Sequence, residues 1–73
     1  MKLDHKKIEL KMAERRMTCA DIADLAGVSR AAVSLTLRRV KNGAETQPAL
    51  VGRLALALGC TATELLAETV ESA

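Results

Sequence analysis

The side chains best suited to binding chemistry are concentrated between residues 30 and 42, where four basic residues accompany two hydroxyl groups and one amide. A planar arginine guanidinium can donate two hydrogen bonds at once to a phosphate group or to the edge of a guanine base. The chain holds a single histidine, no paired acid and base, and no glycine-rich phosphate loop, so these residue types do not favour an enzyme. They favour recognition of a polyanion.

An amphipathic helix over residues 29–39 is predicted to present these groups. Ser29 is suited to cap its N-terminus, and Val28, Val33 and Leu37 form its inward apolar stripe. At about 100° per residue, the side chains that point away from Val33 belong to Ala31, Leu35 and Arg38, with Ala32, Ser34 and Arg39 beside them and Arg30 in the first turn.

A shorter helix is predicted over residues 18–26, directly before a tight turn. Thr18 and Asp21 have the spacing of a capping box, and Gly27 can adopt the positive φ that ends a helix. Two short helices joined in this way are typical of a helix-turn-helix motif, whose second helix enters the major groove of DNA.

Four residues of the second helix are predicted to contact bases: Arg30, Ala31, Ser34 and Leu35. Arg30 can bind guanine O6 and N7, while Ala31 and Leu35 offer apolar surface to a thymine methyl group. Ser34 can reach a base or a phosphate. Two alternatives stay open, because Arg30 can be merely solvated and Leu35 can pack on the helix predicted over residues 4–16 or meet a protein partner.

Phosphate contacts are predicted from two places. Thr18 and Cys19 lie at a helix N-terminus, where backbone N–H groups can bind an anion. The end of the second helix and the loop after it supply Arg38, Arg39, Lys41 and Asn42. Further candidates, for which ordinary solvation is the alternative, are Lys6, Lys7, Arg15 and Arg16. Binding through such contacts is expected to weaken steeply with salt.

Three more helices are predicted to complete a single domain over residues 1–73. One covers residues 4–16, and one begins near Thr46 and Pro48 and ends at Gly59. A last one opens with a second capping box and carries the apolar residues Leu65, Leu66 and Val70. With 49% apolar residues and no aromatic side chain, the composition suits a compact all-α domain of five helices.

The charge is unevenly distributed along the chain. Residues 1–16 hold six basic and three acidic side chains and residues 29–53 hold five and one, whereas residues 17–28 and 54–73 hold only acids. Positive charge therefore accompanies the helix predicted to bind a polyanion. Two cysteines and one histidine are too few for a disulfide framework or a zinc site, so reduced thiols and no cofactor, metal or small-molecule ligand are expected.

No apolar run approaches the roughly 20 residues that span a bilayer, and no signal-peptide pattern occurs, so a cytoplasmic location is expected. A homodimer is also expected, because a domain of this size has a small core. Leu56, Leu66 and Val70 are the predicted interface. The alternative for Leu66 and Val70 is that they close the core of the monomer.

The sequence resembles the Cro/C1-type (XRE-like) helix-turn-helix regulators, especially small phage repressors and Ner-like proteins, over roughly residues 8–66. The resemblance rests on Thr18-x2-Asp21-Ile22-Ala23-x2-Ala26-Gly27-Val28-Ser29-Arg30-x2-Val33-Ser34 and on Leu54-Ala55-x2-Leu58-Gly59-x5-Leu65. Residues 27–34 are also similar to the LacI-type headpiece. Two departures are the Arg38-Arg39-Val40 run with its longer loop and the lack of Gln and Asn in the second helix.

The resemblance implies a lambda-repressor-like domain and a sequence-specific regulator of transcription that binds double-stranded DNA. It further implies a dimer on a palindromic operator, commonly repressing its own promoter, with Arg30, Ala31, Ser34 and Leu35 facing bases. A helical protein-interaction module, antitoxin-like or polymerase-binding, is the alternative function, with Leu35, Leu56 and Val70 as its contacts.

Overall fold

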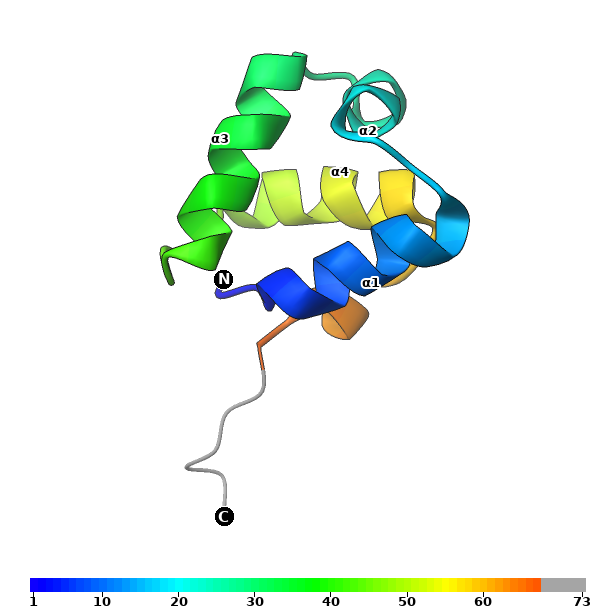
Figure 1. Cartoon of the computed structure of the whole chain (residues 1–73). Helices are drawn as coiled ribbons and strands as arrows, with labels where there is room; N and C mark the ends of the chain where they lie inside the picture. The colour runs from blue at the N-terminus through cyan, green and yellow to red at the C-terminus, as the bar shows by residue number, and fades with distance from the viewer. Residues whose placement is uncertain (68–73) are drawn as a thin grey trace.

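The structure, a computed structural model, describes residues 1–67. Its elements are α1 (His5–Arg15), α2 (Cys19–Ala26), α3 (Arg30–Lys41), α4 (Pro48–Leu58) and a 3-10 helix, η1 (Ala62–Leu65), as Figure 1 shows. These residues contain no strand and form only two isolated antiparallel bridges. The all-helical class expected from the sequence is confirmed.

The predicted capping residues set both ends of α2 and the start of α3. The Thr18 hydroxyl accepts a hydrogen bond from the Asp21 amide at 3.3 Å, and the Asp21 carboxylate accepts one from the Thr18 amide at 2.8 Å. Gly27 ends α2 with a φ of 73°, where a β-carbon would cost about 1 kcal/mol or more. Ser29 then caps α3 by accepting a hydrogen bond from the Ala32 amide at 3.0 Å.

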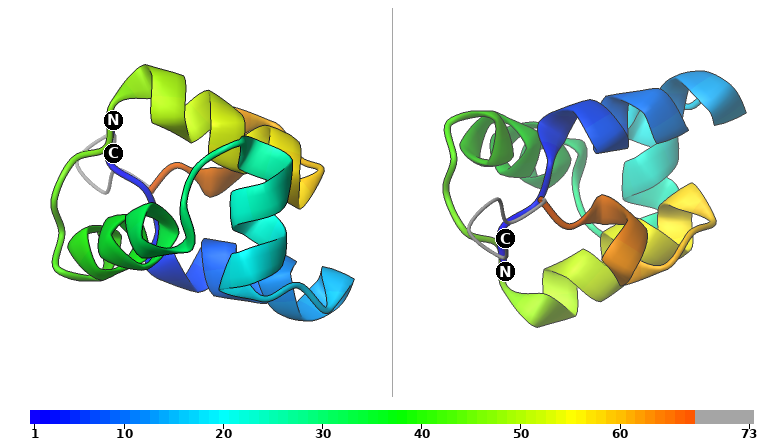
Figure 2. Two further views of the ribbon diagram at one scale, coloured as in Figure 1. Left: turned by 90° about the horizontal axis from the view of Figure 1, so that it is seen from above. Right: turned by 90° about the horizontal axis from the view of Figure 1, so that it is seen from below.

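One core lies between the helices. Viewed from above in Figure 2, α1 to α4 border a common interior. α2 packs against both α3 and α4, so it supports α3 from the core side. The largest fully buried side chains come from every helix: Ile8, Ile22, Val33, Val51, Leu54, Leu58 and Leu65.

The last predicted helix differs from the structure. Its capping box is present, with the Thr61 amide donating to the Glu64 carboxylate at 2.8 Å, but the helix is of the 3-10 type and ends at Leu65. Leu66 is extended and forms an antiparallel bridge with Leu3. A partner distant in sequence therefore replaces further helical turns, and the described residues hold four α-helices. Val70 lies outside the described residues.

The first residues contribute to the fold although no local pattern indicates it. Leu3 is buried in the core, and the Asp4 amide donates to the Leu65 carbonyl at 2.8 Å. The Thr46 amide donates to the Met1 carbonyl at 2.6 Å. This segment thus lies between the loop after α3 and the chain after η1, and α1 begins one residue later than predicted. No helix in residues 1–67 has the length and apolarity to cross a membrane.

Candidate nucleic-acid interface

α3 buries one face and exposes the other. Val33 and Val40 are 1% and 4% exposed, seven residues apart on the core side. Leu35 is 46% exposed, so it does not pack into the core against α1. The structure places all four predicted base-contact residues on the surface of this helix: Arg30, Ala31, Ser34 and Leu35.

The basic end of α3 is longer than predicted. The helix continues to Lys41, two residues beyond the expected end, because Val40 enters the core. Arg38, Arg39 and Lys41 are exposed in the last turn, where cations complement the negative end of the helix dipole. Asn42 follows as the C-cap, and its amide donates to the carbonyl groups of Arg38 and Arg39 at 3.1 Å. Four residues predicted to contact phosphates therefore lie together at the end of α3.

No acid within residues 1–67 forms an ion pair with the cations of α3. Within residues 1–67, ion pairs join the Met1 amine to Glu45, His5 to Glu9, and Lys11 to Glu14 and Glu64. None of these pairs involves α3. Its charges are therefore available to an anion approaching from solvent.

The N-terminus of α2 is less suited to an anion than the sequence indicated. The Thr18 amide is not free, because it donates to the Asp21 carboxylate, and the Thr18 hydroxyl lies 3.1 Å from the same carboxylate oxygen. Cys19 is half-buried against the core. A phosphate at this helix end would meet the negative charge of Asp21, which opposes the favourable helix dipole.

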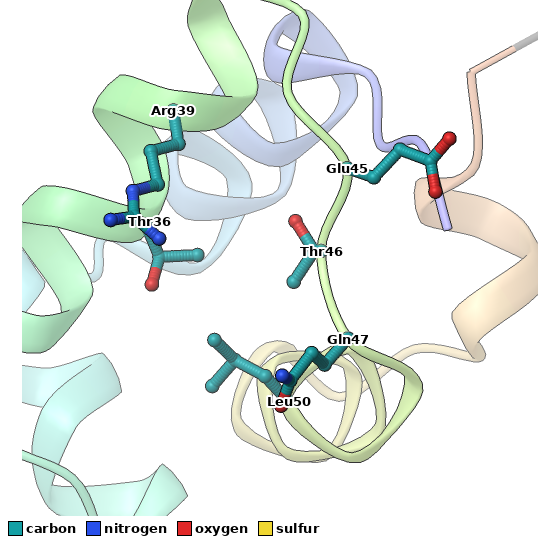
Figure 3. A pocket seen from close by; sticks show the side chains of 6 residues that line it. All are labelled: Thr36, Arg39, Glu45, Thr46, Gln47 and Leu50. Atoms are coloured by element: carbon teal, nitrogen blue, oxygen red, sulfur yellow. The ribbon is translucent and has the colours of Figure 1, made fainter.

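A hollow of about 260 Å³ separates the C-terminal half of α3 from the start of α4, as Figure 3 shows. Its lining consists of Thr36, Arg39, Glu45, Thr46, Gln47 and Leu50. Only Arg39 was a predicted contact. Thr36 lies three residues earlier on the same side of α3, so helical spacing could have identified it. Gln47 is the N-cap of α4 but makes no side-chain capping bond, and no local pattern marks it.

The basic residues of α1 divide into two groups. The Lys7 ammonium group donates to the Leu66 carbonyl at 3.0 Å. The Arg15 guanidinium lies against Gly59, with Nη1 2.7 Å from the place that a β-carbon there would occupy. Lys7 is thus bonded within the domain and the exposed Arg15 lies over the end of α4, while Lys6 and Arg16 are also exposed.

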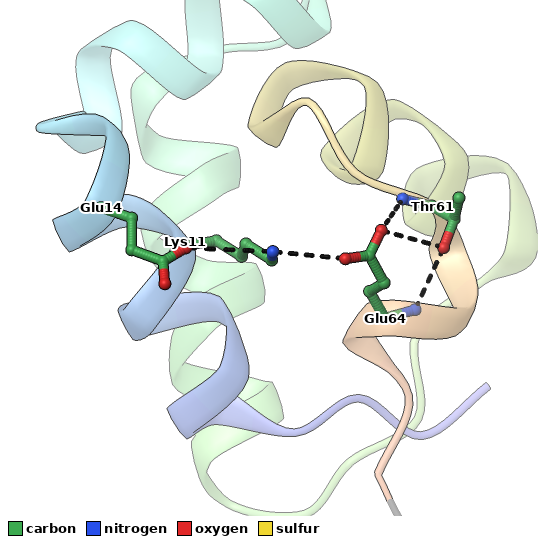
Figure 4. A network of polar contacts seen from close by, with 4 residues as sticks. All are labelled: Lys11, Glu14, Thr61 and Glu64. Carbon is green, nitrogen blue, oxygen red and sulfur yellow. Dashed lines mark hydrogen bonds and ion pairs between the residues drawn. The ribbon is translucent and has the colours of Figure 1, made fainter.

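A polar network ties α1 to the residues around η1, as Figure 4 shows. Lys11 lies 3.2 Å from Glu64 and 3.9 Å from Glu14. The pKa of Glu64 is lowered below its ordinary value. The hydrogen bond from the Thr61 amide has the largest effect, and the contact with Lys11 has the next largest. The hydrogen bond and charge of Glu64 raise the pKa of Lys11 in turn. Burial raises the pKa of the neighbouring Cys60 thiol, which disfavours its reactive thiolate form.

The residues predicted for a dimer interface have separate environments. Leu56 is 76% exposed, as its place opposite the buried side of α4 predicted. Leu66 is half-buried and packs against the core, which is the alternative expected for it. Leu10 and Leu25 are also largely exposed, at 62% and 59%, although the sequence did not single them out.

No group of three or more histidine, cysteine or acidic residues within residues 1–67 is arranged to hold a metal ion. Cys19 and Cys60 are free thiols. Comparisons of the chain with family models, with curated proteins and with solved structures find no match. The geometry of α3 and its surroundings therefore carries the functional argument.

Proposed function

We propose that the protein is a sequence-specific regulator of transcription that binds double-stranded DNA. In this proposal α2 and α3 form the helix-turn-helix of a lambda-repressor-like domain, and α3 lies in the major groove. The exposed residues of its first half, Arg30 to Leu35, face the base edges. Its basic end, Arg38 to Asn42, holds backbone phosphates.

The contrast between the two faces of α3 is the observation that carries the proposal. Val33 and Val40 anchor one face in the core, while the other exposes basic side chains with no ion pair among the described residues. Ala31 and Ser34 are small, so the helix can approach a groove closely. Unpaired cations supply the salt-dependent attraction to DNA, and Arg30 in the first turn can read a base.

The proposed functional unit is a homodimer on a palindromic operator, because one helix in one groove reads only a few base pairs. Such a unit is a phage- or prophage-type repressor or autoregulator that acts in the cytoplasm, on the nucleoid. It uses no metal, cofactor or small-molecule ligand. Leu56 is the interface residue that the geometry favours, since it is a large apolar side chain left outside the core.

DNA binding is tested by selecting bound duplexes from random sequence and titrating the best one by gel shift at increasing salt. We expect Arg30→Ala to weaken binding to the selected duplex by about 1–3 kcal/mol and to relax the preference at one base pair. Arg39→Ala should weaken binding to all duplexes and reduce the slope of log K against log salt by about 0.9.

Lys6→Ala is the matched control, because Lys6 is an exposed cation on α1 and the proposal, unlike the wider set of sequence candidates, limits the DNA contacts to α3 and Asn42. It should leave both the affinity and the salt slope at the wild-type values. A wild-type protein that shifts no duplex even at low salt would contradict the proposal.

The dimer is tested by light scattering of the free protein. We expect a mass of two copies for the wild type and of one copy for Leu56→Glu, because the charge would be buried without a partner at the interface. Leu10→Glu changes an exposed leucine of α1 and should keep the wild-type mass. A wild-type protein that stays a monomer at the concentrations of the gel shift would argue against this unit.

A protein-interaction module is the second candidate, and the exposure of Leu10, Leu25 and Leu56 favours it. In that function the leucines contact a partner protein and the cations of α3 are merely solvated. It would gain support if Arg30→Ala and Arg39→Ala both left DNA binding unchanged.

A further inference from the structure

The C-terminal ends of α2 and α4 have the same structural requirement. α2 ends at Gly27 and α4 ends at Gly59, both in the left-handed conformation, and neither helix has a basic residue in its last turn. The last carbonyl groups of a helix carry partial negative charge and lack intrahelical donors. A cation from elsewhere in the chain can satisfy both requirements.

Arg53 supplies that cation at the end of α2. Its Nη1 atom donates to the Ala26 carbonyl at 3.2 Å, across 27 positions of sequence. The same nitrogen lies 3.6 Å from the place that a β-carbon on Gly27 would occupy. Because Arg53 belongs to α4, this contact ties α4 to the turn that precedes α3.

Arg15 lies over the end of α4, close to Gly59. Its Nη1 and Cζ atoms lie 2.7 and 2.9 Å from the place of a β-carbon on Gly59. This second arginine covers a helix end that is followed by η1 and not by α3. It therefore provides an internal control for the first.

The contact of Arg53 acts on the start of α3. The turn spans residues 27–29, and Arg30 follows it directly as the first residue of the helix. A displacement of the turn therefore changes the direction of Arg30, while Val33 and Val40 keep the middle and end of α3 in the core. Base contacts depend on this direction, whereas phosphate attraction depends on it much less.

We propose that Arg53 is a positioning residue of the proposed DNA-binding site: its guanidinium latches the end of α2 to α4 and thereby sets the direction in which α3 presents Arg30. The latch itself is independent of DNA, but its role in recognition rests on the proposed function. Arg53 accordingly contributes to base reading without contacting a phosphate.

Hydrogen exchange in the free protein tests the latch without DNA. The Gly27 and Val28 amides both donate to the Ala23 carbonyl, at 2.9 and 3.0 Å. We expect Arg53→Gln to speed exchange of these two amides about three- to tenfold, the effect of losing one hydrogen bond. The Cys60 amide, which donates to Ala55 at the end of α4, should be unaffected.

Arg15→Gln is the matched control, because Arg15 lies over the end of the other helix, and it should leave the exchange of Gly27 and Val28 at the wild-type rate. Equal exchange at the two turn amides in wild type and Arg53→Gln would refute the latch.

DNA binding then tests the positioning role. Arg53→Gln should weaken binding to the selected duplex about three- to tenfold, with unchanged affinity for random DNA and an unchanged salt slope. Arg53→Lys, which keeps a cationic donor, should recover most of the affinity. Arg15→Gln should bind the selected duplex as the wild type does.

Three results would overturn the proposal. An equal loss on selected and random DNA with a slope reduced by about 0.9 would make Arg53 a phosphate contact. Wild-type affinity for the selected duplex in Arg53→Gln would reduce the latch to a local stabilising contact. A wild-type protein that binds no DNA would refute the proposed function and the positioning role together, while the exchange of Gly27 and Val28 would still decide whether the latch exists.

Discussion

Two glycines of the α4 region, seven residues apart, have opposite structural requirements. Gly52 lies inside the helix, and a β-carbon there would meet nothing within 4 Å. Gly59 ends the helix with a φ of 70°, and a β-carbon there would overlap the Arg15 guanidinium. A glycine inside a helix weakens it relative to alanine, whereas a glycine in the left-handed conformation avoids a steric cost.

Alanine substitutions at these two sites should therefore change stability in opposite directions. We expect Gly52→Ala to raise the free energy of unfolding by about 0.5–1 kcal/mol and Gly59→Ala to lower it by about 1–2 kcal/mol. Urea unfolding followed by circular dichroism measures both. A Gly59→Ala protein as stable as the wild type would contradict the left-handed conformation assigned to residue 59.

At the scale of elements, α1 and η1 are joined through Glu64. The carboxylate caps η1 through the Thr61 amide and pairs with Lys11 of α1. Because its pKa is lowered in the folded state, the unfolded chain binds the proton first as the pH falls. The stabilisation is full above the unfolded-state pKa and is lost as the pH falls through the folded-state pKa.

The stability of the wild type should therefore fall more steeply between about pH 5 and pH 3 than that of Glu64→Gln. Urea unfolding at a series of pH values gives this comparison. Glu14→Gln is the control, because Glu14 pairs with the same lysine at 3.9 Å but has no capping role. It should retain the wild-type slope, and parallel curves for wild type and Glu64→Gln would contradict the assigned contacts.

Local patterns predicted most of the elements because their ends depend on neighbours in sequence. The capping box of Thr18 and Asp21 acts within one helical turn. The same is true of Gly27 at the end of α2 and of Pro48 at the start of α4. The fifth predicted helix is present only as the short 3-10 helix η1, and its end at Leu65 was missed because the pairing of Leu66 with Leu3 is not local. The extension of α3 was missed for a similar reason, since only the folded core shows that Val40 is buried.

The residues of the candidate site were likewise predictable only where local helical spacing decides their exposure. Helical spacing alone placed Arg30 and Leu35 on the exposed face of α3. It did not show that Lys7 and Arg15 contact other segments of the domain, because those contacts cross the fold. The role of Arg53 likewise depends on where α4 meets α2.

At the scale of the whole molecule, some basic side chains contact other segments of the domain and others are exposed to solvent. Lys7 of α1 and Arg53 of α4 donate to carbonyl groups of other segments, and Lys11 of α1 pairs with Glu64. The cations of α3 are exposed to solvent. Net charge therefore describes the molecule poorly, because the proposed DNA-binding surface consists of the α3 cations that form no ion pair within residues 1–67.

The most direct measurement of the proposed function is an NMR titration of the labelled protein with the selected duplex at about 0.15 M salt. We expect the largest amide shift changes in residues 27–42, with small changes at Leu56 and around η1. Changes centred on α1 or α4, or none at a duplex concentration well above that of the protein, would contradict the claim that α3 reads DNA.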